Sequence, residues 1–564
     1  MNEASSSFKT KSSSFFSTSL SSDKRHSAFV TVQHLKPDTC LNTKSLIYFL
    51  SPRGFYRQIE ASPLGGRLVR GAFWSLAGSL ISRSLGLLSA ILVGRLLGKE
   101  AFGELGIIQN TVGMFGTLAG FGMGLTANKH VAEFKRTAPA HAGRIIALAG
   151  ATAWITSGFM AVVLLVLGPW LAAETLAAPH LGGLLQVGGV LLFLSGINGA
   201  QTGALSGFEA FKAIASINLI SGLLTFPLMV TGALYWGVAG AVWGLIGSQL
   251  ANCLLCFVAL RAEAARFQIP IRLSGALAES KLFWSFSFPA VLTGVLNSAV
   301  AWGASALVVN QAGGYGDMGI YNAALRVKLL PETFLAMLIA PMLPILSEAF
   351  GKGDRDTFQR TLQFNFLLAT LIIVPVSLVQ AAAPALTLMS FGPQYQGDPV
   401  VVLWLMLHAV LYALMFPMGS VLISMGRMWF SLVINGIFAV LFGAAALLLV
   451  PRYGAAGYAA SMTVAYGLAN LPSVVFLYQQ LPAVMNYLRW GLVAAVGILL
   501  FVACIMAFQQ LPFAWGTVAG FLAAAAFVAL KYHLHSAAMM KLANPSVLVG
   551  TSSCTEATPK CSLG

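Results

Sequence analysis

The sequence predicts an all-α integral membrane protein with about 14 transmembrane helices, arranged as two six-helix lobes in a parallel repeat and two extra C-terminal helices. Of the 564 residues, 57% are hydrophobic and only 9% are charged, whereas a soluble domain carries about 25% charged residues. From Gly71 onward, apolar runs of the length that crosses a bilayer, about 20 residues, follow one another. Similar short motifs also recur at a nearly constant distance along the chain.

The apolar runs define the spans that we expect, and the connections between them are short. In chain order the expected spans are 71–97, 102–127, 144–170, 183–205, 213–235, 238–261, 282–312, 318–348, 358–390, 399–425, 428–450, 455–478, 488–508 and 513–531. The first hairpin turns at Gly98, Lys99 and Glu100. Such short connections leave no room for a soluble catalytic domain.

The spans divide the chain into an N-lobe over residues 67–262, a C-lobe over 281–480 and two extra helices within 487–533. Residues 534–564 form a polar tail. Residues 1–66 are rich in Ser, Lys and Arg, which predicts a disordered cytosolic tail. A transit peptide has a similar composition, but the acidic residues in this segment disfavour that alternative.

Lysine and arginine give the orientation, because cytoplasmic loops carry an excess of both. The net charge is +15, and the basic residues lie in short gaps between apolar runs rather than in nucleic-acid-binding patches. One set of loops is rich in them, while the alternate loops hold little beyond Lys99 and Arg452. We therefore expect a multi-pass protein of the cytoplasmic (inner) membrane with both termini in the cytosol.

Six pairs of motifs support a duplication of the chain. They occur in the same order, and the distance between partners drifts slowly from 210 to 218 residues. The pairs begin or end at Phe73 and Phe283, Phe102 and Tyr315, Arg144 and Arg360, Asn218 and Asn435, Trp236 and Tyr453, and Asn252 and Asn470. Six spans per repeat make both copies run in the same direction across the membrane. Parallel repeats of this kind are typical of transporters that bind substrate where the repeats meet.

Three cations lie inside expected spans, which is costly in a bilayer and usually functional. Arg83 lies about 18 Å along its helix, at 1.5 Å per residue, which is too deep for easy snorkelling. Arg326 and Lys328 lie in span 318–348 of the other lobe. Cations that face one another between lobes would bind an anion, and a guanidinium suits phosphate oxygens. A buried ion pair, or snorkelling to headgroups, is the structural alternative.

Glu332 is the acidic residue deepest inside a span, four residues after Lys328 and therefore on the same helix face. Two interpretations stay open: a neutral pair with Lys328, or a carboxylate that couples transport to Na⁺ or H⁺. His408 is a lone histidine for which packing is favoured over a proton relay. No cofactor or metal site is expected, since the cysteines, including Cys253 and Cys256, lack a metal-binding spacing.

Other conspicuous residues have structural explanations. Glu104 and Asp317 occupy matching helix starts, where acidic side chains complement the helix dipole. Prolines interrupt several spans and would bend the helices there. They are Pro227, Pro289, Pro331, Pro344, Pro375 and Pro417. A glycine-rich face at Gly116, Gly120, Gly122 and Gly124 indicates close packing between helices.

The chain resembles the multidrug/oligosaccharidyl-lipid/polysaccharide (MOP) exporter superfamily over residues 67–480. Ser82-Arg83-Ser84-Leu85-Gly86 and Gly94-Arg95-Leu96-Leu97-Gly98 are similar to the first helix of its lipid-linked sugar flippases. Their eighth helix is similar to Tyr321–Phe350, with Arg326, Pro331, Leu343-Pro344 and Ser347 at the recurring positions. Thr126–Arg136 looks more like the polysaccharide and O-antigen branch than the peptidoglycan-precursor branch, in which a second arginine stands at the position of Ser89.

This resemblance implies a non-enzymatic flippase that moves a polyprenyl-diphosphate-linked oligosaccharide to the outer leaflet by alternating access. It implies that Arg83 and Arg326, with Lys328 as a further candidate, contact the substrate, and that Glu332 is the candidate for ion coupling. Membrane lipid, and a polysaccharide polymerase or glycosyltransferases, are the expected partners. Three alternatives stay open. A cation-coupled multidrug antiporter would need acidic residues in its cavity, and a membrane sugar polymerase or ligase would need a large outer loop. The third alternative is a static scaffold.

Overall fold

The computed structural model describes residues 63–480 apart from 121, 275–279, 340–341 and 396–398. The expected spans 488–508 and 513–531 and the two tails lie outside the described residues. Contacts divide the chain into the units Met1–Gly66 and Arg67–Gly564, and every contact reported below lies in the second. Within the described part of the chain, the regular elements are helices without strands, as predicted.

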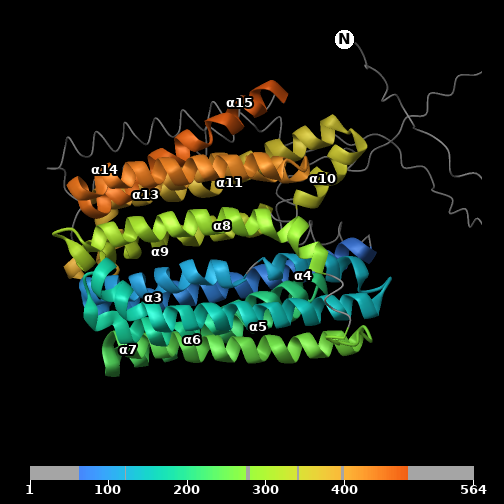
Figure 1. The fold of residues 1–564 in the computed structure, drawn as a ribbon. Helices are drawn as coiled ribbons and strands as arrows, with labels where there is room; N and C mark the ends of the chain where they lie inside the picture. The colour runs from blue at the N-terminus through green and yellow to red at the C-terminus, as the bar shows by residue number, and fades with distance from the viewer. Residues whose placement is uncertain (1–62, 121, 275–279, 340–341, 396–398, 481–564) are drawn as a thin grey trace, which may run out of the picture. The chain divides into compact units, whose positions relative to one another are not determined.

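Long helices run side by side through the second unit (Figure 1). The α-helices are α3 (Pro63–Gly120), α4 (Met123–Phe134), α5 (Pro139–Trp170), α6 (Gly182–Gly207), α7 (Phe211–Arg266), α8 (Ser280–Val309), α9 (Gly314–Ile339), α10 (Met342–Lys352), α11 (Arg355–Ala382), α12 (Pro384–Met389), α13 (Pro399–Ser424), α14 (Met428–Ala469) and α15 (Leu471–Gln480). Short π- and 3-10 turns, η1 (Leu171–Thr175), η2 (Pro179–Leu181) and η4 (Pro393–Tyr395), join α5 to α6 and α12 to α13.

Three of the longest helices are helical hairpins that reverse at a glycine. Non-helical backbone occurs at Gly98 in α3, at Gly237 in α7 and at Gly454 in α14. In α7 the two arms then lie against each other, because a Cβ at Gly240 would come within 1.9 Å of the Gly232 carbonyl oxygen. Among the described residues, eight helices are long and apolar enough to cross a membrane. Counting these hairpins twice and adding α9, the described residues cross the bundle twelve times.

The duplication predicted from the motifs is visible in local geometry. Gly237 and Gly454, 217 residues apart, share an unusual backbone conformation, with φ +60° and ψ −137° at the first and φ +51° and ψ −127° at the second. Asn218 of α7 donates to Ser79 of α3 at 3.3 Å, and Asn297 of α8 donates to Asn435 of α14 at 2.9 Å. Each bond therefore joins the first and fifth crossings of one repeat, which confirms a duplicated six-crossing unit.

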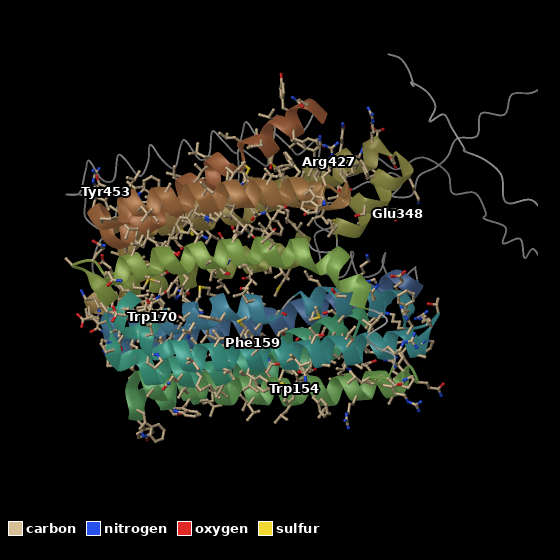
Figure 2. The ribbon with its side chains drawn as sticks, viewed as in Figure 1. Trp154, Phe159, Trp170, Glu348, Arg427 and Tyr453 are labelled. Carbon is tan, nitrogen blue, oxygen red and sulfur yellow. The ribbon has the colours of Figure 1, made fainter. Side chains whose placement is uncertain are left out.

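The helix surfaces explain where lipid would lie. On α5, the exposed residues Ile155, Phe159, Val162, Val166 and Trp170 form one apolar stripe at helical spacing, each with 56–72% of its surface exposed. Water would make such a stripe costly, whereas hydrocarbon would not. Figure 2 shows Phe159 beside Trp154 on this helix, with Glu348 and Arg427 near one end of the bundle and Tyr453 near the other.

Some expected boundaries were wrong. The expected span 102–127 is divided, because Gly122 adopts the left-handed conformation before α4. Residues 340–341 of the expected span 318–348 lie outside the described residues. Prolines inside α7, α9, α11 and α13 do not end those helices. The reversals occur at glycines instead, since only glycine takes these positive φ angles at little cost.

The two copies of the matched motif meet where α3 and α9 cross. A Cβ at Gly103 would come within 1.9 Å of the Tyr315 carbonyl oxygen, and a Cβ at Gly319 within 1.9 Å of the Lys99 carbonyl oxygen. Gly103 belongs to the motif FGELGI, which begins at Phe102, and Gly319 belongs to its partner YGDMGI, which begins at Tyr315. Backbone-to-backbone contact of this kind requires small residues. The repeated motif therefore holds the second arm of α3 against α9, next to the cavity described below.

Candidate functional site

A cavity of about 610 Å³ lies between the α3–α7 helices and α9. Most of its lining comes from α3, α6 and α7, and only Asn322 and Arg326 come from α9. The remaining polar side chains of the lining are Ser89, Gln109, Thr117, Ser195 and Thr225. This volume is in the range of small-molecule binding sites. Among the described residues that line it, Arg326 is the one with a formal charge, so the cavity favours an anionic group.

Arg326 projects into the cavity, where its side chain is exposed. Its Nη2 donates a hydrogen bond to Oε1 of Gln109, a cavity residue on α3. The two residues are 217 positions apart in the chain. This bond uses part of the guanidinium, which carries five N–H donors. The rest of the fork is left for an anionic ligand, and an anion could also replace the neutral amide of Gln109.

Arg83 lies on the first arm of α3, and its side chain is exposed. The residues three and seven positions later, Gly86 and Ala90, line the cavity. Residues at this spacing share one face of a helix. Arg83 also lies close enough to Arg326 for the two positive charges to repel each other. The structure therefore brings the two arginines that the sequence singled out close to each other, with Arg326 in the cavity lining and Arg83 on a helix face that it shares with lining residues.

Three consecutive side chains of α3 bind the α8–α9 hairpin. Beside the Gln109 contact, Asn110 donates to Ser305 at 3.5 Å, and the Trp302 indole donates to the Thr111 hydroxyl at 2.9 Å. Thr111 in turn donates to the backbone carbonyl of Ile107 at 2.8 Å. Polar contacts between helices are conspicuous in a bundle with so few polar side chains. They fix the second arm of α3 at the level of the arginines.

One wall of the cavity is made of glycine. A Cβ at Gly113, Gly116 or Gly120 of α3, or at Gly199 of α6, would meet no atom within 4 Å. We predicted close helix packing for Gly116 and Gly120, and the structure corrects this: both line the cavity. The prediction holds for Gly124, where a Cβ would lie 2.7 Å from the Gly199 carbonyl oxygen. Without side chains, this wall is wide and smooth.

Aromatic residues close the cavity at the end where α3 reverses. Phe102, at the cavity edge, packs on Phe391 and Tyr395 with ring centroids 5.7 and 6.2 Å apart. The Tyr395 hydroxyl donates to the Gly94 carbonyl oxygen at 3.0 Å, and Arg95 Nε donates to the Ser390 carbonyl oxygen at 2.7 Å. Burial raises the pKa of Tyr395, so the hydroxyl keeps its proton and remains a donor. We call this contact the Gly98-end seal.

Lys328 and Glu332 lie away from the cavity. Lys328 Nζ is 3.0 Å from Glu332 Oε1, and the side chains are only 3% and 8% exposed. The spacing had left a neutral pair as one interpretation, and the structure contains that pair. Neither residue belongs to the cavity lining. The cation that the sequence offered as a third substrate contact is instead held by the carboxylate one turn later.

The remaining sequence candidates lie in other structural settings. The His408 ring packs on Tyr466 at 4.8 Å between centroids, and its Nδ1 has no hydrogen-bond partner among the described residues. Glu104 contacts His180 at 2.9 Å, and Asp317 accepts from the backbone nitrogen of Ala455 at 3.3 Å. These two carboxylates therefore join helix ends. The sequence had predicted only that they interact with the helix dipole.

Cys256 of α7 lines a small polar cavity of about 130 Å³ between α6 and α7, and Cys253 lies outside that lining. Cys256 donates to Asn252 at 3.4 Å and Cys253 donates to Gln201 at 3.5 Å. Both thiols are free and buried. Their contacts agree with the packing role that their spacing predicted.

The sequence did not predict that Gln109 and Asn322 line the cavity. Gln109 and Asn322 are uncharged and were not considered among the buried cations and acids. A signal was present for Asn322, because it precedes Arg326 by four residues and shares its helix face. Gln109 had no such signal, since its partner is 217 residues away. Ser89, where related peptidoglycan-precursor flippases carry arginine, lines the cavity.

A duplicated bundle with apolar outer stripes and a cationic cavity between its halves defines a multi-pass membrane transporter. The sequence matches the family model described as "Polysaccharide biosynthesis protein" over residues 68–350, about half of the chain. The chain belongs to this family, which is part of the MOP superfamily. No curated protein is similar enough to be matched.

Solved structures share the fold. "Lipid II flippase MurJ, inward closed conformation" has a TM-score of 0.60 and 15% identity, over 81% of this chain and 98% of that one. A "multidrug resistance MATE family transporter of the MOP superfamily" in an inward-facing conformation has a TM-score of 0.54 and 15% identity, over 74% and 99%. A "MOP superfamily transporter from Pyrococcus furiosus", whose title describes a "reverse polarity of binding pocket", has a TM-score of 0.54 and 14% identity, over 74% and 96%. These neighbours show that the chain shares their fold.

Proposed function

We propose that the protein flips a polyprenyl-diphosphate-linked oligosaccharide across the cytoplasmic membrane by alternating access. The observation that carries the proposal is the pair Arg83 and Arg326. Arg326 lines the cavity, and Arg83 lies within reach of its charge on the helix face that Gly86 and Ala90 of the lining share. Two like charges repel across a medium of low dielectric constant. A diphosphate between them would turn this repulsion into attraction.

The chemistry of the cavity supports an anionic substrate over a cationic drug. Arg326 is the charged residue of the lining, and no acidic residue lines the described cavity. The acidic residue nearest to it on α9, Glu332, is paired with Lys328. Guanidinium groups bind phosphate oxygens through two parallel hydrogen bonds, which offset the cost of removing the phosphate from water. The smooth glycine wall leaves space beside Arg326 for sugars, while the prenyl chain stays in lipid.

The transport cycle that we propose uses the Gly98-end seal as the outer gate. The basic residues near Arg427 and Lys135 favour a cytosolic location for the opposite end, so the cavity would accept substrate from the inner leaflet. Protonation of Glu332, or Na⁺ binding there, would loosen the pair with Lys328 and help to reset the transporter. Glycosyltransferases would supply the substrate and a polysaccharide polymerase would use the product.

The test is transport by purified protein in proteoliposomes that contain a fluorescent polyprenyl-diphosphate oligosaccharide. We expect Arg83→Ala and Arg326→Ala each to lower the flipping rate at least tenfold, because a hydrogen bond to a charged group is worth about 1.5–3 kcal/mol and about 1.4 kcal/mol is a factor of ten. Arg326→Lys should recover only part of the rate, since lysine lacks the planar fork.

Arg261→Ala is the matched control, because this arginine stacks on Phe257 at 4.5 Å outside the cavity. Normal flipping by the Arg83→Ala and Arg326→Ala variants at equal protein levels would contradict the proposal. Transport of a cationic drug, with no effect of the lipid diphosphate, would favour the antiporter instead.

A further inference from the structure

Asn322 is a buried polar residue of the cavity wall without a complete set of partners. Its side chain is only 7% exposed and lines the cavity. Its Nδ2 has no hydrogen-bond partner among the described residues. An unpaired amide N–H is costly to bury, so a structure normally satisfies it. The described residues supply no partner for this N–H, which lies against Gly106, so a ligand in the adjoining cavity could become its partner once the amide turns.

Gly106 provides the seat for this side chain. A Cβ at Gly106 would lie 1.8 Å from Asn322 Nδ2 and 2.6 Å from its Cγ. The amide thus packs against the bare backbone of α3 with its nitrogen nearest to Gly106, at the point where the repeated motifs cross. Any side chain at position 106 would displace it. The space that a side chain at position 106 would fill is taken by the Asn322 amide. The absence of a side chain at Gly106 and the position of Asn322 therefore depend on each other.

We propose that Asn322 and Gly106 form a sugar subsite that reads the first residue of the oligosaccharide, next to the diphosphate held by Arg326. Asn322 precedes Arg326 by four residues, which is about 6 Å along the helix toward the Gly98-end seal. A diphosphate that contacts Arg326 would therefore bring its attached sugar to the level of Asn322. This inference rests on the proposed function and assigns a recognition residue within the same cavity.

The chemistry of the amide fits a sugar better than a phosphate. An asparagine side chain offers two donors and an accepting oxygen, and rotation by 180° exchanges the two ends. A sugar hydroxyl both donates and accepts, so it can use either end. A phosphate oxygen only accepts, and the arginines already supply donors for it. The glycine wall of the same cavity, where a Cβ at Gly113 or Gly116 would meet no atom within 4 Å, leaves room for a sugar ring.

The experiment measures binding of two probes to the full chain in nanodiscs. One probe is a polyprenyl diphosphate without sugar, and the other is the same lipid carrying the oligosaccharide. Asn322→Ala should weaken binding of the glycosylated probe by about three- to tenfold, the range expected for one neutral hydrogen bond, and leave the sugar-free probe within twofold. Unchanged binding of the sugar-free probe also shows that the variant is folded.

A matched pair of glycine variants tests the seat. Gly106→Ala should reproduce the selective loss, because its Cβ would occupy the position of the amide. Gly150 of α5 lies outside the cavity lining, and a Cβ there would meet no atom within 4 Å, so Gly150→Ala should bind both probes normally. The double variant Asn322→Ala/Gly106→Ala should lose no more than Asn322→Ala alone, since the clash disappears with the amide.

The outcomes separate this inference from the function on which it rests. An equal loss for both probes in Asn322→Ala would show that the residue contacts the phosphates or only supports the fold, and would overturn the sugar subsite. Unaltered binding of the glycosylated probe would overturn it as well. Failure of the unmodified protein to bind either probe would instead contradict the proposed function.

Discussion

At the scale of single residues, the pair Lys328 and Glu332 shows how burial changes the contribution of a charged group to stability. The two groups are 3.0 Å apart and nearly inaccessible, so each compensates for the desolvation of the other. Removing one partner leaves a buried charge without compensation, whereas replacing both with apolar residues removes the problem. Lys352 and Glu348 have the same spacing but are 70% and 65% exposed, and water solvates them in either state.

We therefore expect Lys328→Met and Glu332→Gln each to destabilise the protein by about 3 kcal/mol, and the double variant Lys328→Met/Glu332→Met to lie within about 1 kcal/mol of the original. Denaturant unfolding in detergent measures the difference. Glu348→Gln is the control and should leave the unfolding midpoint unchanged. If Glu332 couples transport to an ion, the stable double variant should also lose the dependence of flipping on a Na⁺ or H⁺ gradient. Equal stability of the single and double variants would refute the pairing argument.

At the scale of elements, the equivalent turns of the two repeats, at Gly237 and Gly454, have different neighbours. Gly237 in α7 and Gly454 in α14 adopt nearly the same positive-φ conformation. A Cβ at Gly237 would meet no atom within 4 Å, whereas one at Gly454 would lie 2.2 Å from Asp317 Oδ2. The first turn depends only on the backbone freedom of glycine. The second also needs space for the carboxylate that accepts a hydrogen bond from Ala455.

Gly237→Ala should lower the free energy of unfolding by about 2 kcal/mol, because a strained backbone conformation usually costs about 1–3 kcal/mol. Gly454→Ala should lower it clearly more. The double variant Gly454→Ala/Asp317→Ala should be no less stable than Gly454→Ala, since removing the carboxylate removes the clash. Thermal unfolding of the purified variants provides the comparison. A smaller loss at Gly454 than at Gly237 would show that the carboxylate does not constrain the turn.

For the whole molecule, access to the cavity depends on contacts between segments far apart in sequence. The Gly98-end seal joins Gly94 and Arg95 of α3 to the α12–α13 connection, about 300 residues later. The polar contacts of Gln109, Asn110 and Thr111 join α3 to the α8–α9 hairpin. Alternating access would require the first group to break. Each of its hydrogen bonds therefore contributes to the population of the state closed at this end.

Tyr395→Phe removes the hydroxyl that binds the Gly94 carbonyl and should increase exposure of the cavity from the Gly98 end. A loss of about 1 kcal/mol corresponds to about a fivefold change in population. The measurement is labelling of a single cysteine at the open position 113 (Gly113→Cys) by a membrane-impermeant maleimide. Tyr453→Phe is the control, because this tyrosine is 62% exposed. Equal labelling of the two variants would show that the hydroxyl does not hold the seal.

The sequence alone determined the class of fold, the helical hairpins, the repeat and the two arginines. These properties follow from local information: apolar runs of bilayer length, glycine at reversals, and charge where a membrane penalises it. The repeat added one longer-range inference, because matching motifs such as those at Phe102 and Tyr315 must occupy equivalent positions. The spans after residue 480, the orientation and the substrate stay predictions.

The tertiary structure decided which side of each helix faces the cavity. Lys328 turns to Glu332 while Arg326, two residues earlier, enters the cavity and meets Gln109. The same packing makes Gly116 a wall, Gly124 a helix contact and Asn322 an unsatisfied amide. The physical reason is that helical periodicity relates neighbours along one helix, whereas the partner across a cavity depends on packing between segments more than 200 residues apart.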